Sequence, residues 1–427
     1  MTLEADVNRF GAKGAVLKYI HETDSSIPIE PFVLVPVGED WRLHLNDIER
    51  LGDSLVRSSS PLEDGKKISF AGIFGTEKFA LDGSVQYVLN SANSLEARRY
   101  ARIHGIEGPI EMALVFQRDS KSYYNWSILR HPHMSNLLFA MGRPVDDRAR
   151  VSRNYVFDER TKTLHDVVDY NSSRIDGRKR PEEGMWVDLE TAIKTYKKIE
   201  SMPEFQTDFA YQMEFGTTPF SVYQFRPFRK KEKASWTLKR RRNLGIFDNE
   251  YSICFGITPP EGYELKLVRG LNSNKVRNHV NLYSKLTDEG KSREEIIKEL
   301  MKEAEFNEQE RIYAEMITRI PKDTLGSVET KAYELALRKL NRQLAKDETC
   351  LYQEDMHNYY GKGSDLVFPN AKVWVPQGAL QFLSHEWFRP LQHYDVSLLG
   401  YASLGGKTGD KVRVFSDGVR GLIIQSK

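Results

Sequence analysis

Lys13 is the first residue in the sequence whose setting suggests chemistry. It lies between Gly11 and Gly14, immediately before a helical pattern. Glycines let backbone amides approach a phosphate closely, the lysine adds a positive charge, and a helix N-terminus adds its dipole. Taken alone, the motif favours an exposed lysine in a turn, so an anion site needs support from other segments.

Arg57 is a second candidate, near the end of a strand-like run. An arginine at a strand end can hold phosphate oxygens in a bidentate manner. The Ser-Phe-Ala-Gly segment at 69–72, which ends in Gly72, is suited to closing over a bound nucleotide. Glu63 and Asp64 lie between these two features. Acidic loops by themselves are mostly just solvated, but this order of Arg-Ser-Ser, an acidic pair and Ser-Phe-Ala-Gly is unlikely in a generic loop, which makes the segment the most specific of the set.

Residues 211–228 read as two strands joined as a hairpin, and they carry Glu214, Gln224 and Arg226. Mg²⁺ prefers oxygen ligands and usually takes one or two from the protein together with phosphate oxygens. Glu214 and Gln224 supply such oxygens, and Arg226 would neutralise charge on a phosphoryl group during its transfer. The alternative is a structural hairpin with polar surface groups.

These side chains must be positioned by a mixed set of elements. Short apolar, β-branched runs predict strands at 31–37, 53–59 and 111–117. Gln117 ends the third run, where a strand can offer its backbone and an amide to an adenine base, although a core strand is equally expected. Helical patterns cover 91–103 and 189–199, the second with Ala192, Ile193, Tyr196 and Ile199 on one face. The first half is therefore expected to be an α+β or α/β domain.

The composition is that of an ordinary globular chain. The 427 residues are 40% hydrophobic and 29% charged, with a net charge of +2. This balance gives no general attraction to nucleic acid. The N-terminus lacks the positive charge and apolar core of a signal peptide, and no run is apolar enough to cross a membrane, so we expect a cytoplasmic protein without a membrane partner. The two cysteines, Cys254 and Cys350, suggest buried thiols.

The second half changes character twice. A basic run at 229–250 is read as a linker, with a phosphate or nucleic-acid patch as the alternative. Residues 272–344 are highly charged and helical in pattern, and Ser292 with Glu295 forms a capping box that predicts a helix start. The last sixty residues return to short apolar runs separated by glycine turns, which predict strands.

Together the four segments of the first half resemble the nucleotide-binding domain of phosphoenolpyruvate synthase and pyruvate phosphate dikinase, an ATP-grasp-type domain. The matching elements are Gly11-Ala12-Lys13-Gly14, Val56-Arg57-Ser58-Ser59, Ser69-Phe70-Ala71-Gly72, Glu214 and Gln224-Phe225-Arg226-Pro227. The resemblance implies that ATP and Mg²⁺ are bound. Lys13 and Arg57 would contact phosphates, Glu214 and Gln224 would hold Mg²⁺, and Arg226 would stabilise the transferring group. Residues 125–144 depart from the family and contain no equivalent of a family glutamate; His131 and His133 there are read as surface or packing residues.

The same resemblance extends faintly to a swivelling domain that carries a phosphohistidine. Residues 254–270 look like its opening and 373–424 like its remainder, with Ser384-His385 at the place of the phosphorylated histidine. Leu380 and Gln381 replace the family's paired glycines. An imidazole suits phosphoryl relay because it is nucleophilic near neutral pH. His385 as a packed histidine is the alternative, and the order of parts is similar to that of rifampin phosphotransferase.

We therefore expect an ATP-grasp-like domain, a charged helical middle and a small β-rich swivelling-type domain, with boundaries 1–228, 229–250 (linker), 251–271 with 365–427, and 272–364 (helical insertion or acceptor module). The expected activity is dikinase-type phosphotransfer from Mg-ATP through His385 to an unknown acceptor. A nucleotide sensor without transfer is the alternative, and a nucleic-acid role ranks last. No large phosphoenolpyruvate-binding barrel fits in the chain, so such a substrate would need a partner chain.

Overall fold

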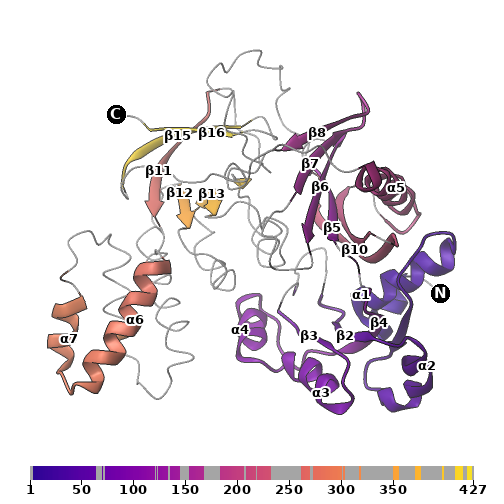
Figure 1. The fold of residues 1–427 in the computed structure, drawn as a ribbon, viewed down its shortest axis with the longest axis horizontal. Coiled ribbons are helices and arrows are strands. Elements are labelled where there is room, and N and C mark those ends of the chain that lie inside the picture. The colour runs from indigo at the N-terminus through magenta and orange to yellow at the C-terminus, as the bar shows by residue number, and fades with distance from the viewer. Residues whose placement is uncertain are drawn as a thin grey trace. The chain divides into compact units, whose positions relative to one another are not determined.

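The computed structural model is shown in Figure 1. It describes residues 3–63, 70, 73–120, 122, 124–132, 135–144, 153–167, 183–205, 208–217, 219–231, 261–269, 273–300, 302, 317–318, 350–354, 371–376, 397–398, 409–416 and 421–425. These residues form two compact units, one reaching Lys231 and the other starting at Glu261. Among the helices of the described ranges, none combines the length and apolar character needed to span a bilayer.

The first unit contains an antiparallel four-stranded sheet in the order β1-β4-β2-β3. Its strands are β1 (Phe32–Val35), β2 (Ser54–Ser59), β3 (Thr76–Lys78) and β4 (Ala113–Arg118). The helices η1 (Trp41–His44), α2 (Leu45–Arg50) and α3 (Asp82–Ser91) belong to the same part of the chain. Val56 and Phe116 pack with Val85 and Val88 of α3 in one apolar cluster. The strands predicted at 31–37, 53–59 and 111–117 are confirmed.

The helix predicted at 91–103 starts later than its pattern indicates. α3 ends at Ser91 and α4 (Leu95–Ile103) begins four residues on. The hydroxyl of Ser94 accepts a hydrogen bond from the backbone amide of Ala97 at 3.1 Å, which is an N-cap. A serine cap inside an otherwise helical pattern therefore divides the segment.

The second sheet of the first unit has six strands in the order β10-β9-β5-β6-β7-β8, all antiparallel. They are β5 (Tyr124–Arg130), β6 (Leu137–Pro144), β7 (Arg153–Asp158), β8 (Thr163–Val167), β9 (Phe209–Gly216) and β10 (Ser221–Lys230). Helix α5 (Glu183–Glu200) lies against this sheet (Figure 1). Among its described side chains, the buried apolar ones are Leu189, Ala192, Ile193, Tyr196 and Ile199, so the predicted apolar stripe is confirmed. β9 and β10 confirm the predicted hairpin.

An ion cluster holds the C-terminal end of α5 to the sheet. Arg130 of β5 donates to both carboxylate oxygens of Glu200, each at 2.6 Å, and to Glu159 at 2.9 Å. Burial by itself would lower the pKa of Arg130, but its hydrogen bonds with Glu200 and Glu159 raise that pKa above its usual value. The guanidinium therefore stays charged inside the unit.

Helix α1 (Leu3–Thr23) packs against β2, β4 and β10, and it is broken at Gly11. Gly11 has φ 69° and ψ 173°, a conformation that is essentially restricted to glycine. Lys18 donates to Asp6 at 3.0 Å, although twelve residues of straight helix would separate them by about 18 Å. The break therefore turns the first part of the helix back on the second.

The second unit contains a six-stranded sheet in the order β14-β13-β12-β11-β15-β16. Its strands are β11 (Tyr263–Arg269), β12 (Cys350–Glu354), β13 (Ala371–Pro376), β14 (Ser397–Leu398), β15 (Lys411–Ser416) and β16 (Gly421–Gln425). β11 to β14 pair in parallel, whereas β15 is antiparallel to both β11 and β16. β12 lies within 272–364, which was expected to be helical, and Cys350 on it is a buried free thiol.

Helices α6 (Ser273–Asp288) and α7 (Arg293–Leu300) also belong to the second unit. The capping box predicted at the start of α7 is confirmed. The Ser292 amide donates to the Glu295 carboxylate at 2.8 Å, and the Glu295 amide donates to the Ser292 hydroxyl at 3.3 Å. A local sequence pattern thus sets this helix start.

Replacing Gly11 with alanine is expected to lower the free energy of unfolding by about 3–5 kcal/mol. The new Cβ would lie 2.1 Å from the carbonyl oxygen of Ser59 and would occupy a strained φ. Urea unfolding followed by tryptophan fluorescence measures the change, because Trp41 and Trp126 are buried in this unit. Gly38→Ala is the matched control: φ there is also positive, at 76°, but nothing lies within 4 Å, so a loss of only about 1–2 kcal/mol is expected. Equal losses at the two positions would contradict the close approach.

Candidate phosphate-binding and metal-binding site

The Phe10–Gly14 segment and the end of β2 are hydrogen-bonded into one structure. The Ser59 hydroxyl donates to the Phe10 carbonyl at 2.7 Å and accepts from the Gly14 amide at 3.0 Å. The Ala12 amide donates to the Ser60 carbonyl at 3.1 Å. The glycine break in α1 allows this approach, so Lys13 is fixed beside the strand that carries Arg57.

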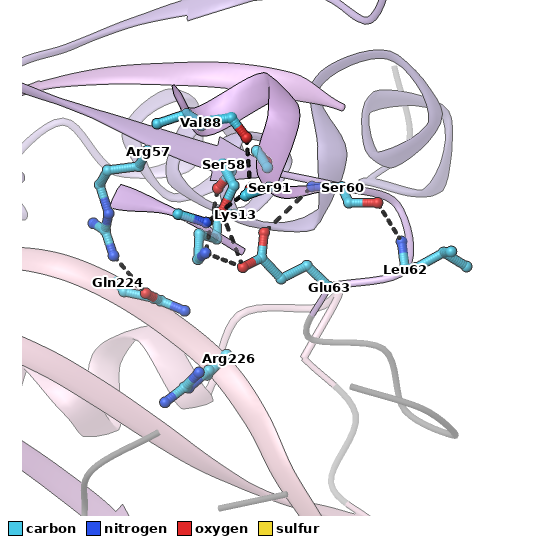
Figure 2. A network of polar contacts seen from close by, with 12 residues as sticks. Lys13, Arg57, Ser58, Ser60, Leu62, Glu63, Val88, Ser91, Gln224 and Arg226 are labelled. Carbon is cyan, nitrogen blue, oxygen red and sulfur yellow. Dashed lines mark hydrogen bonds and ion pairs between the residues drawn. The ribbon is translucent and has the colours of Figure 1, made fainter. Parts of the chain in front are cut away.

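Lys13 is 8% exposed and points to the strand end (Figure 2). Its ammonium donates to the Ser58 carbonyl at 3.2 Å and forms an ion pair with Glu63. Glu63 thus differs from the usual solvated acidic residue of a loop, because its side chain is only 1% exposed. Its carboxylate also accepts from the Ser58 hydroxyl at 3.3 Å and from the Ser60 amide at 3.4 Å.

A sequence signal for Glu63 was present in the spacing of Ser60 and Glu63. A serine followed three residues later by glutamate is the capping-box pattern. Half of it forms here: the Ser60 amide donates to the Glu63 carboxylate at 3.4 Å, whereas the Ser60 hydroxyl accepts from the Leu62 amide at 3.3 Å and the Glu63 amide donates to the Ser60 carbonyl at 3.0 Å. The pattern predicts the turn. The pairing with Lys13, fifty residues away, has no local signal.

Arg57 connects the two sheets of the first unit. It donates to the Gln117 side-chain oxygen of β4 at 2.6 Å within its own sheet. It also donates to the Gln224 side-chain oxygen at 2.7 Å and the Tyr223 carbonyl at 3.1 Å, both on β10 of the second sheet. Figure 2 shows the bond from Arg57 to Gln224. Gln117 and Gln224 are both buried, whereas Arg57 itself is half-buried.

The second sheet divides its side chains sharply between two faces. Tyr211, Met213 and Phe215 of β9 join the apolar core with α5. The alternating residues Gln212 and Glu214 lie on the opposite face, as strand geometry requires. Directly across the ladders, Glu214 pairs with Gln224 of β10 and with Ser127 of β5, and Gln212 pairs with Arg226. One face of the sheet is thus polar next to the Arg57 bridge.

Arg226 is 2% exposed and held by two neighbours on this polar face. It donates to the Gln212 side-chain oxygen at 2.7 Å and to Glu214 at 3.2 Å. Gln212 in turn donates to the Ser127 hydroxyl at 2.6 Å. Sequence reasoning did not select Gln212, although its position two residues before Glu214 placed both on one face of a strand.

The residues selected from the sequence therefore form a continuous series of contacts in the first unit. Lys13 is hydrogen-bonded to Ser58, the neighbour of Arg57 on β2. Arg57 is hydrogen-bonded to Gln117 and Gln224. Gln224 pairs with Glu214 across the ladder, and Glu214 accepts a hydrogen bond from Arg226. Gly72, His133 and His385 lie outside the described residues. His131 is buried, with its ring against Phe139, in keeping with a packing role.

No protein-family profile matches this chain, and no curated protein matches it. Among solved structures, it is similar to a D-alanine–D-alanine ligase from Bacillus anthracis complexed with ATP (9% identity, 51% of this chain, 53% of the ligase, TM-score 0.28). It is also similar to D-alanine–D-alanine ligase from Helicobacter pylori (12%, 53% and 56%, TM-score 0.27). A dinucleotide-forming acetyl-coenzyme A synthetase from Ca. Korarchaeum cryptofilum matches at 12% identity over 49% of this chain and 89% of the synthetase, with TM-score 0.29.

The chain spans just over half the length of the two ligases that it matches. Similarity at this level leaves the function to be argued from the residues of the site itself.

Replacing Arg57 with methionine is expected to lower the free energy of unfolding by about 2–4 kcal/mol, because the buried oxygens of Gln117 and Gln224 lose a charged donor. Urea unfolding measures the change. Arg50→Met is the matched control, since Arg50 is 79% exposed and pairs with Asp47 at the surface, so a change within about 0.5 kcal/mol is expected there. A similar small effect at Arg57 would show that the bridge does not hold the sheets together.

Proposed function

We propose that the first unit binds ATP with Mg²⁺ and that the chain is an ATP-dependent phosphotransferase of the ATP-grasp type. The observation that carries this proposal is the contact series from Lys13 through Arg57 and Gln224 to Glu214 and Arg226. These residues come from segments far apart in the sequence, and their types are those that a metal–triphosphate needs. The resemblance of the same motifs to the dikinase nucleotide domain supports the same ligand.

The polar face of β9 and β10 suits a Mg²⁺ ion that arrives with the nucleotide. The Glu214 side chain is 21% exposed, and the Gln224 amide lies across the ladder from it. The described residues contain no group of three or more carboxylate, imidazole or thiol ligands placed to hold a metal without other help. Mg²⁺ commonly takes one or two protein carboxylates and completes its shell with phosphate oxygens and water.

The charged side chains have separate tasks under this proposal. Mg²⁺ would neutralise the phosphate oxygens and polarise the transferring group. Lys13 and Arg57 would bind phosphates from the β2 side, and Arg226, oriented by Gln212, would stabilise the charge that develops on the phosphoryl group. Gln117 at the end of β4 would lie beside the adenine.

We further propose that the chain carries out a dikinase-type reaction. The imidazole of His385 would attack the β-phosphorus of ATP with AMP as the leaving group, and water would cleave the β–γ bond to release inorganic phosphate. The β-phosphoryl group left on His385 would then pass to an unidentified acceptor. An imidazole is nucleophilic near neutral pH and forms a labile phosphoramidate, which suits a relay. The sequence motif around Ser384-His385 supports this step.

The products of Mg-ATP turnover test the reaction type. We expect AMP, with label from β-³²P-ATP retained on the protein and lost in His385→Ala. Glu214→Gln should reduce turnover about 100-fold through loss of a metal ligand, whereas Glu204→Gln, at an exposed position, should leave it unchanged. ADP as the product would replace the dikinase reaction with a ligase-type or kinase-type one. Nucleotide binding without any product would support a sensor instead.

Divalent-cation binding tests the metal assignment separately. Mn²⁺ titrated into the protein alone, followed by its electron paramagnetic resonance signal, is expected to bind with a Kd weaker than about 1 mM. Glu214 is the one carboxylate that β9 and β10 carry, and it already pairs with Arg226. Adding a non-hydrolysable ATP analogue should give tight, stoichiometric uptake that Glu214→Gln weakens. Tight Mn²⁺ binding without nucleotide would contradict a metal site completed by phosphate.

A further inference from the structure

We propose that Glu63 is a positioning residue that aims the Lys13 ammonium at a phosphate oxygen of the bound nucleotide. This inference rests on the proposed nucleotide site and assigns a role to a carboxylate that the motif comparison left out. Its basis is the buried pairing between the two side chains, which are 9% and 1% exposed.

The donors of Lys13 set the direction of the ammonium. A lysine ammonium has three N–H donors. One reaches the Ser58 carbonyl at 3.2 Å and another reaches Oε1 of Glu63. The described residues offer no acceptor for the third. A buried donor without a partner is unfavourable, so a phosphate oxygen in that direction would complete the ammonium's bonding.

Glu63 is itself fixed by the strand end that carries Arg57. Oε2 accepts from the Ser60 amide at 3.4 Å, Oε1 accepts from the Ser58 hydroxyl at 3.3 Å, and the Glu63 amide donates to the Ser60 carbonyl at 3.0 Å. The carboxylate is therefore a rigid acceptor. A lysine side chain has four rotatable carbon–carbon bonds and loses much freedom when it is ordered, and a rigid acceptor orders it before the ligand arrives.

Lys18, a second lysine of α1, serves as a comparison because its partners and its exposure differ from those of Lys13. It pairs with Asp6 at 3.0 Å and with Glu22 at 2.7 Å, and its side chain is 22% exposed. Glu22 is 59% exposed, and the interaction spans one helical turn. The Lys18–Glu22 pair is thus a surface pair, whereas the Lys13–Glu63 pair joins two chain segments inside the proposed site.

An alternative role for Glu63 predicts the opposite effect. If the carboxylate merely competed with phosphate for Lys13, its neutralisation would tighten nucleotide binding. If it orients the ammonium, neutralisation weakens binding of a triphosphate and acts only through Lys13. The sign of the change and its dependence on Lys13 therefore separate the two roles.

The experiment measures the binding of Mg²⁺ with the β,γ-imido analogue of ATP by titration calorimetry. Glu63→Gln keeps the size of the side chain and is expected to weaken binding about tenfold, equal to about 1.4 kcal/mol, while AMP binding changes less than about twofold. In a Lys13→Met background the same change should have no further effect, as a double-mutant cycle requires for two residues that act together. Glu22→Gln is the matched control and should bind as the wild type does.

Equal or tighter binding by Glu63→Gln would overturn the positioning role. A loss that persists in the Lys13→Met background would also overturn it, because Glu63 would then act through the Ser58–Ser60 turn. If Glu63→Gln does not fold, Glu63→Asp keeps the charge but withdraws it from Lys13, and it should give an intermediate loss of triphosphate affinity; unchanged affinity would again reject the role. Failure of the wild type to bind the analogue would instead reject the proposed nucleotide site and, with it, this inference.

Discussion

One guanidinium, that of Arg57, sets how the polar groups of the first unit face one another. The planar fork of an arginine offers donors in fixed directions, and here they reach Gln117 within one sheet and Gln224 and Tyr223 in the other. Lys13 lies beside Ser58, the next residue along β2. The bridge thus links the strand beside the glycine–lysine segment to β10, in addition to the packing of α1 on β10.

The apolar side of the second sheet determines which residues are available on its polar side. Side chains alternate along a strand, so a slip of one residue would exchange the faces. Met213 and Phe215 are buried in the core that includes α5, and this burial fixes the register that leaves Gln212 and Glu214 on the other face. Packing of the apolar face against α5 thus determines which side chains the polar face presents. The ion cluster of Arg130 with Glu200 at the end of α5 helps to hold that helix on the sheet.

Sequence patterns were sufficient for the features that depend on neighbouring residues. The three strands, the α5 stripe and the Ser292 capping box all follow from period and local hydrogen bonding. The contacts join those residues chosen for their chemistry that the structure describes, whereas Gly72 and His385 lie outside the described residues. Gln212 and the pairing of Glu63 were missed for a different reason. Their partners, Lys13 and Arg226, come from other segments, and no local pattern encodes a contact made by tertiary folding. The division of α3 from α4 was missed because a single serine cap overrides a continuous helical pattern. β12 follows the charged helical pattern of 272–344, and the parallel neighbours that define it come from elsewhere in the chain.

The missing side chain of Gly11 makes two distant stretches of chain interdependent. Ser59 occupies the space that any larger residue at position 11 would need, and the backbone of residues 10–14 is bonded to residues 59 and 60. Neither stretch is a self-contained module. A designer who transplanted the glycine–lysine segment into another scaffold would have to carry the end of β2 with it. The backbone conformation of each stretch depends on its hydrogen bonds with the other.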